Sequence, residues 1–253
     1  MPVYIGAGAM TSSAGRDPRT IARNIPGILN AIFPGLTPGI VSFYNKSAIA
    51  CSVIVVPAEA IQASELQKSL LFELAFAVGE QLVLGNNPTW GECVATATGR
   101  QSRFFDAISP SEISENDQRI ARRVANNLVT MVKQVATDCN STYGAAPVIP
   151  GFRWIASGTG DFFAGSTLIE VKCIAGNFSA ADYRQVVMYW LLSYAAAVET
   201  GNDEWRSCVL MNPRTGKLVN IDFDEFIHLT GGGRSKVEIL QAFTATLTDI
   251  QKF

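Results

Sequence analysis

Between residues 58 and 138, apolar side chains recur every three to four positions, which is the period of a helix with one buried face. This pattern predicts a first helix from Pro57 to about Leu84, where the Gly-Asn-Asn-Pro run at 85–88 stops it. A second helix is predicted to begin after Ser114, whose hydroxyl suits an N-cap. Its polar face is basic, and we interpret this face as solvated, with phosphate contact as the alternative. The basic residues are Arg119, Arg122, Arg123 and Lys133.

Shorter apolar runs, which predict strands, lie on both sides of this helical part. They cover residues 49–56, 152–156, 167–173, 208–211 and 218–221. The last two runs flank Asn212-Pro213-Arg214-Thr215-Gly216, a sequence typical of a hairpin turn. Residues 140–150 are predicted to form a loop.

Two more helices are predicted in the C-terminal part. Ser179 can cap a long helix through Glu199 that ends at Gly201, with Tyr183 and Trp190 in its apolar stripe. The last helix covers about 235–250. Together these elements predict an α/β fold with a mixed sheet of four or five strands flanked by helices. Residues 1–57, rich in Gly and Pro, are predicted to form an irregular N-terminal elaboration ending in a strand, ahead of a domain at 58–253.

Composition narrows the class of protein. Of the 253 residues, 48% are hydrophobic and the mean hydropathy is +0.19, so we expect buried interfaces, including homo-oligomer contacts, as well as a core. Without a long apolar stretch or a secretory leader, the protein is expected to be intracellular and free of membrane contact. A net charge of -2 limits nucleic-acid binding to locally grouped cations. Five cysteines without a CxxC pair argue against a disulfide framework, a zinc ribbon and an iron-sulfur cluster.

Two carboxylates and one amine lie close together in the run from Gly158 to Lys172. Side chains alternate along a strand, so Glu170 and Lys172 share one face, and a hairpin turn can bring Asp161 alongside Glu170. Two carboxylates, with the backbone carbonyl of Val171 as a third ligand, suit a divalent cation and leave room for water and a phosphate oxygen. A lysine beside such a site can orient the attacking water. The same residues also fit an exposed strand on which Glu170 and Lys172 form an ion pair.

Two polar residues in the following helix favour the metal site over the exposed ion pair. Gln185 and Tyr189 are four residues apart, and hence on one helix face. The order of GxxD ending at Asp161, ExK at 170–172 and QxxxY at 185–189 resembles the RecB-like branch of the PD-(D/E)xK nuclease superfamily, over residues 150–253. This resemblance implies a restriction-endonuclease-like fold.

The resemblance also implies a role for each motif residue. Asp161 and Glu170 would bind Mg²⁺ or Mn²⁺, and Lys172 would serve the nucleophile. Gln185 and Tyr189 would position the lysine and the substrate. The implied reaction is metal-dependent hydrolysis of a phosphodiester bond in nucleic acid, with DNA expected ahead of RNA.

Two expectations concern residues outside these motifs. The family takes a further acidic residue or histidine from an upstream helix, but the only histidine, His228, lies downstream. Glu73 and Glu80, seven residues apart on one face of the first predicted helix, are the candidates for this metal ligand, with a surface position as the alternative for each. Arg184, beside Gln185, is the candidate for substrate binding through a phosphate, with simple exposure as the alternative.

Other functions fit the sequence less well. A Ser-His-Asp hydrolase would need His228 together with a G-x-S-x-G elbow, which the sequence lacks. The glycine-rich runs at 6–9 and 231–236 do not match a phosphate-loop motif. The remaining alternative is a catalytically inactive member of the same fold that acts as a scaffold or binds nucleic acid or protein. The presence of all five motif residues argues against this alternative.

Overall fold

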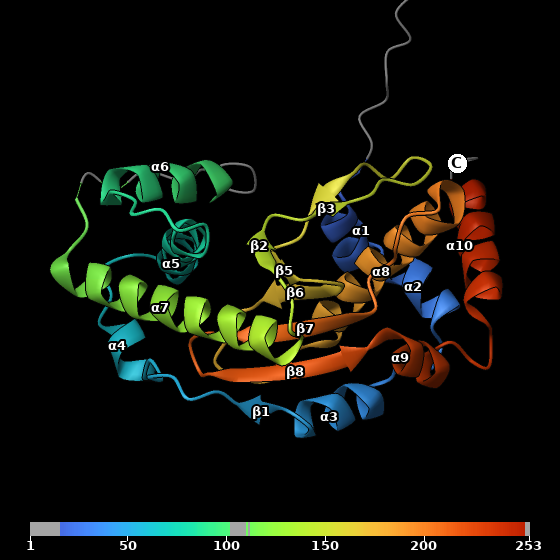
Figure 1. Ribbon diagram of the computed structural model, residues 1–253, viewed down its shortest axis with the longest axis horizontal. Helices are drawn as coiled ribbons and strands as arrows, with labels where there is room; N and C mark the ends of the chain where they lie inside the picture. Colours follow the sequence, from blue (N-terminus) through green and yellow to red (C-terminus); the bar gives the residue numbers. More distant parts are fainter. Residues whose placement is uncertain (1–15, 102–109, 111, 251–253) are drawn as a thin grey trace, which may run out of the picture.

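The centre of the molecule is a mixed six-stranded sheet with helices on both faces (Figure 1). The computed structural model describes residues 16–101, 110 and 112–250. Along the sheet the strands follow the order β1-β8-β7-β6-β5-β2, and β6 with β7 is the parallel pair among antiparallel neighbours. The strands are β1 (Ile49–Ala50), β2 (Tyr143–Ala145), β5 (Phe162–Ala164), β6 (Thr167–Val171), β7 (Ser207–Asn212) and β8 (Lys217–Asp222). A separate pair is formed by β3 (Val148–Ile149) and β4 (Gly158–Thr159).

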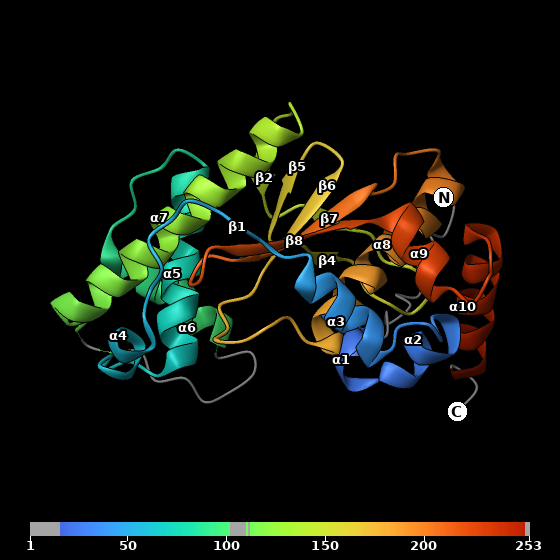
Figure 2. The same ribbon diagram turned by 90° about the horizontal axis from the view of Figure 1, so that it is seen from below.

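The two faces of the sheet are covered by different sets of helices. Along β6, Ile169 packs into one core cluster with residues of α7, whereas Leu168 packs into another with residues of α8. Both faces are therefore buried, as expected for a sheet between helical layers. The α7 side contains α4 (Ala58–Gln62), α5 (Lys68–Val83), α6 (Trp90–Gln101) and α7 (Glu115–Asp138). The α8 side contains α1 (Pro18–Asn24), α2 (Pro26–Ile32), α3 (Pro38–Lys46), α8 (Ala180–Thr200), α9 (Phe223–Thr230) and α10 (Lys236–Ile250). Figure 2 shows the two groups of helices apart from each other.

Helix α8 is the crossover between the parallel strands β6 and β7, and it begins and ends where the sequence predicts. Ser179 and Asp182 form a capping box at its start, and Gly201 ends it in the left-handed conformation with a φ of 74°. Tyr183 and Trp190 are fully buried in its apolar stripe, which confirms the prediction for both. The hairpin at 212–216 is also confirmed, because it joins β7 to β8.

The N-terminal region differs from the prediction of irregular structure. Residues 18–46 form three helices, and each of these helices begins with a proline in its first turn. Proline is well tolerated there because the first helical residues need no intrahelical hydrogen-bond donor. Of the strand predicted at 49–56, only Ile49 and Ala50 pair in the sheet. The part of the prediction that covers residues 1–15 lies outside the described residues.

Three further predictions need correction, and one helix was not predicted. The helix predicted at 57–84 is divided into α4 and α5, and α6 is the helix that the sequence did not predict. The loop predicted at 140–150 contains β2 and β3, which are too short to show a pattern on their own. Residues 152–156 form a turn rather than a strand, in which Phe152 and Ile155 bond to each other. The apolar residues of this run pack against α10 instead of pairing in a sheet. Phe152 stacks on Phe243, and the indole N–H of Trp154 donates to the carbonyl of Leu247.

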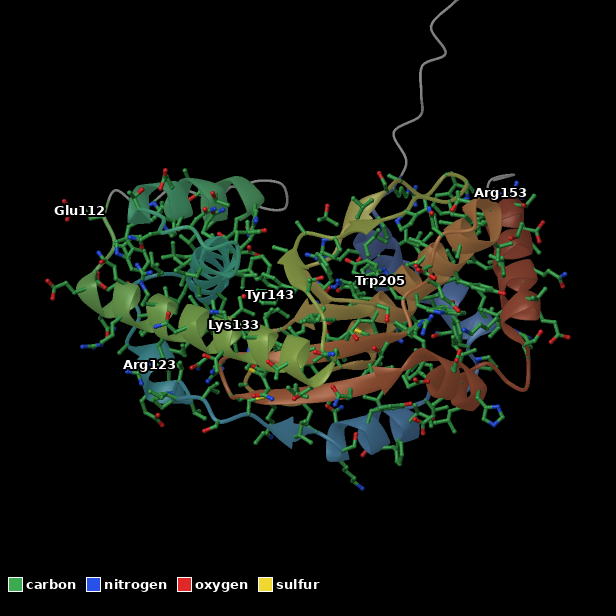
Figure 3. The ribbon with its side chains drawn as sticks, in the orientation of Figure 1. Glu112, Arg123, Lys133, Tyr143, Arg153 and Trp205 are labelled. Carbon is green, nitrogen blue, oxygen red and sulfur yellow. The ribbon has the colours of Figure 1, made fainter. Side chains whose placement is uncertain are left out.

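The basic face of α7 is at the surface. Arg123 and Lys133 are exposed along it (Figure 3), whereas Arg122 lies over the ring of Trp90. No hydrogen bond or ion pair links this face to the motif residues in the described part of the chain. Across residues 16–101, 110 and 112–250, none of the helices combines the length and apolar character that a membrane crossing requires.

Candidate functional site

The hairpin of β5 and β6 brings the two motif carboxylates together. Its register pairs Phe162 with Ile169, which leaves Asp161 opposite Glu170. The backbone N–H of Val171 donates to Oδ2 of Asp161 at 2.8 Å and fixes this carboxylate, so its Oδ1 is the oxygen left to face the site. The side chain of Asp161 is 11% exposed and that of Glu170 is 1% exposed. The predicted convergence of the two carboxylates is therefore present in the structure.

Lys172 lies on the same strand face as Glu170, and both side chains are buried beneath α8. Its Nζ is 2.7 Å from Oε1 of Glu170 and donates to Oε1 of Gln185 at 3.0 Å. The lysine side chain is 10% exposed, so the interpretation of a solvent-exposed Glu170–Lys172 pair is excluded. A buried ion pair of this kind needs further hydrogen bonds to offset desolvation.

Helix α8 supplies those further hydrogen bonds. Gln185 is fully buried, and its Nε2 donates to Oε1 of Glu170 at 2.6 Å and to the Tyr189 hydroxyl at 2.9 Å. Because Gln185 and Tyr189 are one turn apart on the same helix face, a single helix can contribute both. These hydrogen bonds join Glu170, Lys172, Gln185 and Tyr189 into one network, and Asp161 is connected to it through Arg19.

The site also contains two arginines from α1 that the sequence analysis did not identify. Nη2 of Arg19 lies 3.3 Å from Oδ1 of Asp161 and 3.9 Å from Oε1 of Glu170, and its Nε donates to the Tyr189 hydroxyl at 3.2 Å. One turn later, Arg23 donates to Oε1 of Gln185 at 3.3 Å. A signal was present in the sequence, because Asp17-Pro18 is a typical helix start and arginines four residues apart share a helix face.

The surroundings of the two carboxylates shift their proton affinities in opposite directions. Burial, together with the charge of Glu170, raises the pKa of Asp161 from 3.8 to about 6, although Arg19 and Lys172 act against this rise. Burial would also raise the pKa of Glu170, but Lys172 and Arg19 outweigh it and lower this pKa below its usual value. Burial opposes the charge of Arg19, yet Glu170 and Asp161 raise its pKa overall. Asp161 is therefore the carboxyl of the pair that takes up a proton first.

The oxygen atoms of this site suit a hard divalent cation such as Mg²⁺ or Mn²⁺. Oε2 of Glu170 is buried without a hydrogen-bond partner in the described part of the chain, an arrangement that is costly for a carboxylate. A cation between this atom and Oδ1 of Asp161 would satisfy it and offset the repulsion between the carboxylates. Among residues 16–101, 110 and 112–250, no group of three His, Cys, Asp or Glu side chains is arranged around one point. The remaining ligands would then be water, substrate or a backbone carbonyl.

Glu73 and Glu80, the candidates for an additional metal ligand, have different surroundings in the structure. Glu80 forms an ion pair with Arg100 at 2.6 Å. Glu73 is partly buried, and burial raises its pKa, whereas the charges of Arg100 and Arg19 act against this rise. Glu73 thus interacts electrostatically with Arg19, which also contacts both motif carboxylates. A metal-ligand role for Glu73 and for the Val171 carbonyl stays a prediction.

In the part of the chain that the structure describes, no hydrogen bond or ion pair connects Arg184 to the five motif residues. It precedes Gln185, and one residue along a helix turns a side chain by about 100°. Its Nε is buried without a hydrogen-bond partner in the described residues. A role in substrate binding therefore stays a prediction.

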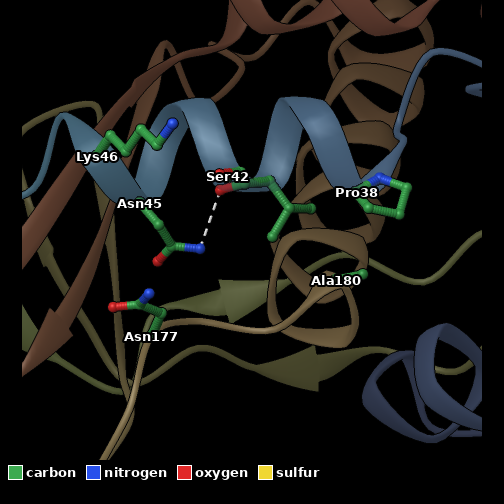
Figure 4. A pocket seen from close by; sticks show the side chains of 7 residues that line it. Pro38, Ser42, Asn45, Lys46, Asn177 and Ala180 are labelled. Carbon is green, nitrogen blue, oxygen red and sulfur yellow. Dashed lines mark hydrogen bonds between the residues drawn. The ribbon is translucent and has the colours of Figure 1, made fainter.

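The cavity in Figure 4 is separate from the motif network. Its volume is about 430 Å³, and it lies between α3 and the start of α8. Asn45 lines it, but its amide is committed to the carbonyls of Val41 and Phe178. The other lining residues are Pro38, Val41, Ser42, Lys46, Asn177 and Ala180, none of which belongs to the motifs.

Comparison with known proteins identifies no relative of this chain. No protein-family model, curated protein or solved structure matches the chain.

Proposed function

We propose that this chain is a metal-dependent nuclease of the PD-(D/E)xK kind that hydrolyses phosphodiester bonds. One observation carries the proposal: Asp161 and Glu170 both face the Arg19 guanidinium, Lys172 contacts Glu170, and Oε2 of Glu170 is buried without a partner among the described residues. A restriction-endonuclease-like fold is supported by the mixed sheet, whose parallel pair is connected by the helix that carries Gln185 and Tyr189.

The chain's own residues have separate tasks in this reaction. Asp161 and Glu170 would hold Mg²⁺ or Mn²⁺, which when bound polarises a phosphate oxygen and promotes ionisation of a water. Lys172, held between Glu170 and Gln185, directs its remaining donor capacity at the attacking water and at the charge developing on the phosphate. Gln185 fixes Lys172 and Glu170 relative to each other through its carbonyl and amide groups. The buried network keeps these groups in place before substrate arrives.

The proposed substrate is nucleic acid, and we expect DNA ahead of RNA by resemblance. Three cations, Lys172, Arg19 and Arg23, gather around the network. These cations are balanced by nearby carboxylates, but a bound divalent cation would add two positive charges, so that the site could attract phosphates although the whole chain carries a net charge of -2.

A cleavage assay tests the proposal. Wild type, Lys172→Ala and the control Lys217→Ala are incubated with single-stranded and double-stranded DNA and RNA in Mg²⁺, Mn²⁺ or EDTA. Lys217 is an exposed lysine of β8, so its loss removes the same charge away from the site. We expect cleavage by wild type and Lys217→Ala in metal, and none in EDTA or by Lys172→Ala. Cleavage by Lys172→Ala at the wild-type rate would refute the proposal.

The assay also separates the proposal from its alternative, a catalytically inactive scaffold or binding module of the same fold. Such a module would cleave none of the four substrates in either metal. If it nevertheless bound nucleic acid or the cation, the arrangement of the site would serve recognition instead of hydrolysis.

A further inference from the structure

We infer that Arg19 occupies the place of the divalent cation in the metal-free protein and couples binding of the cation to binding of the substrate phosphate. This inference rests on the proposed function and adds a regulatory residue to the same site. Arg19 lies outside the PD-(D/E)xK motifs, in the short helix α1. The guanidinium would leave the carboxylates when the cation arrives and would then be free to bind a phosphate.

The guanidinium and the cation compete for the same oxygen. Oδ2 of Asp161 already accepts a hydrogen bond from the Val171 amide, so Oδ1 is the more available oxygen for a cation. Nη2 of Arg19 faces this oxygen at 3.3 Å. A divalent cation coordinates oxygen at about 2.0–2.6 Å. Two positive groups cannot share one carboxylate oxygen at these distances without strong repulsion.

The charges around the site favour a phosphate once the cation is bound. The acidic groups Asp161, Glu170 and Asp182 face the basic groups Lys172, Arg19 and Arg23, and Glu73 adds a negative charge near Arg19. A divalent cation adds two positive charges and leaves a positive excess. A phosphodiester group beside the cation offsets part of the excess, and an arginine released from the carboxylates is a suitable partner for it.

The side chain of Arg19 can move without a movement of α1. Ile21 and Ala22 are fully buried, and Asp17 caps the start of the helix through the backbone N–H of Thr20. The backbone of α1 is thus anchored, whereas the side chain of Arg19 is 38% exposed. Rotation of this side chain alone would carry the guanidinium away from the carboxylates and leave it within reach of a phosphate at the site.

Binding of Mn²⁺, measured by calorimetry without nucleic acid, tests the first half of the inference. The variants are Arg19→Gln, the control Arg16→Gln and the reference Asp161→Asn. Arg16 is exposed and belongs to the same segment, so its loss removes an equal charge without touching the carboxylates. We expect Arg19→Gln to bind Mn²⁺ at least about tenfold more tightly than wild type, because a competing cation at contact distance is gone. Arg16→Gln should match wild type, and Asp161→Asn should not bind. Arg19→Met serves as a second neutral variant if Arg19→Gln does not fold.

Repeating the titration with an uncleavable single-stranded phosphorothioate oligonucleotide tests the second half. The oligonucleotide should tighten Mn²⁺ binding severalfold in wild type, since binding free energies are coupled reciprocally. In Arg19→Gln, the oligonucleotide should tighten Mn²⁺ binding much less.

The outcomes separate this inference from the proposed function. If wild type binds Mn²⁺, Asp161→Asn does not, and Arg19→Gln binds no more tightly than wild type, the metal site stands and the role of Arg19 is refuted. Equal tightening by the oligonucleotide in wild type and Arg19→Gln would refute the coupling. If none of the variants binds Mn²⁺, the metal site and the inference are both refuted.

Discussion

Replacing Asp161 with asparagine is expected to stabilise the metal-free protein at neutral pH while it destroys the metal site. Asparagine has nearly the same shape, and its carbonyl oxygen can still accept the hydrogen bond from the Val171 amide. The substitution removes a negative charge that is buried beside Glu170, together with the acceptor at Oδ1 that Arg19 contacts. A site whose carboxylates are placed to bind a cation should lower the stability of the fold when that cation is absent.

The magnitude follows from the pKa of Asp161. Burial and Glu170 raise this pKa from 3.8 to about 6, and each pKa unit corresponds to about 1.36 kcal/mol. Because the folded protein holds the proton more tightly than the unfolded chain, ionisation of Asp161 lowers the stability of the fold as the pH rises from about 4 through 6. Above this range, the ionised side chain costs about 3 kcal/mol relative to a neutral one.

Chemical denaturation of wild type and Asp161→Asn in EDTA, at pH 4 and at pH 7.5, measures this cost. The unfolding free energies should be similar at pH 4, and at pH 7.5 the variant should be more stable by about 1–3 kcal/mol. Saturating Mg²⁺ should then stabilise wild type alone, by about 2.7 kcal/mol at one hundred times its dissociation constant. A variant that is less stable than wild type at pH 7.5 in EDTA would refute the reasoning.

Three further predictions address the network and its pH dependence. Tyr189→Phe should destabilise the protein by about 1–3 kcal/mol, because buried donors of Gln185 and Arg19 lose their acceptor. Tyr183→Phe, in the same helix, should be close to neutral by the same denaturation assay, because the Tyr183 hydroxyl is buried without a partner in the described residues. The affinity for Mn²⁺, measured by calorimetry, should fall up to about tenfold per pH unit below pH 6, because protons then compete with the cation for Asp161. An affinity that is unchanged between pH 7.5 and pH 5 would contradict this prediction.

The parts of the fold that the sequence predicted correctly are those set by local chemistry. Helix α8 has its capping box at Ser179 and its left-handed glycine at Gly201, and both signals act within a few residues of the helix ends. The convergence of Asp161, Glu170 and Lys172 follows from side-chain alternation in one hairpin. Short sequence separations made these features predictable.

The features that were missed depend on contacts between distant segments. Strands β2 and β3 pair with β5 and β4, and neither shows a pattern without its partner. The prolines at 18, 26 and 38 signal turns when viewed singly, yet each lies in the first turn of a helix that tertiary packing stabilises. Arg19 reaches Asp161 across 142 positions of sequence, so its place in the site could not be inferred from spacing.

The most direct test of the metal site is a crystal structure of the protein with Mn²⁺, located by its anomalous scattering. We predict a peak at about 2.0–2.6 Å from carboxylate oxygens of both Asp161 and Glu170. The guanidinium of Arg19 should have moved off Oδ1 of Asp161. An empty position between the two carboxylates at saturating Mn²⁺, with Arg19 still in contact with Asp161, would contradict the account.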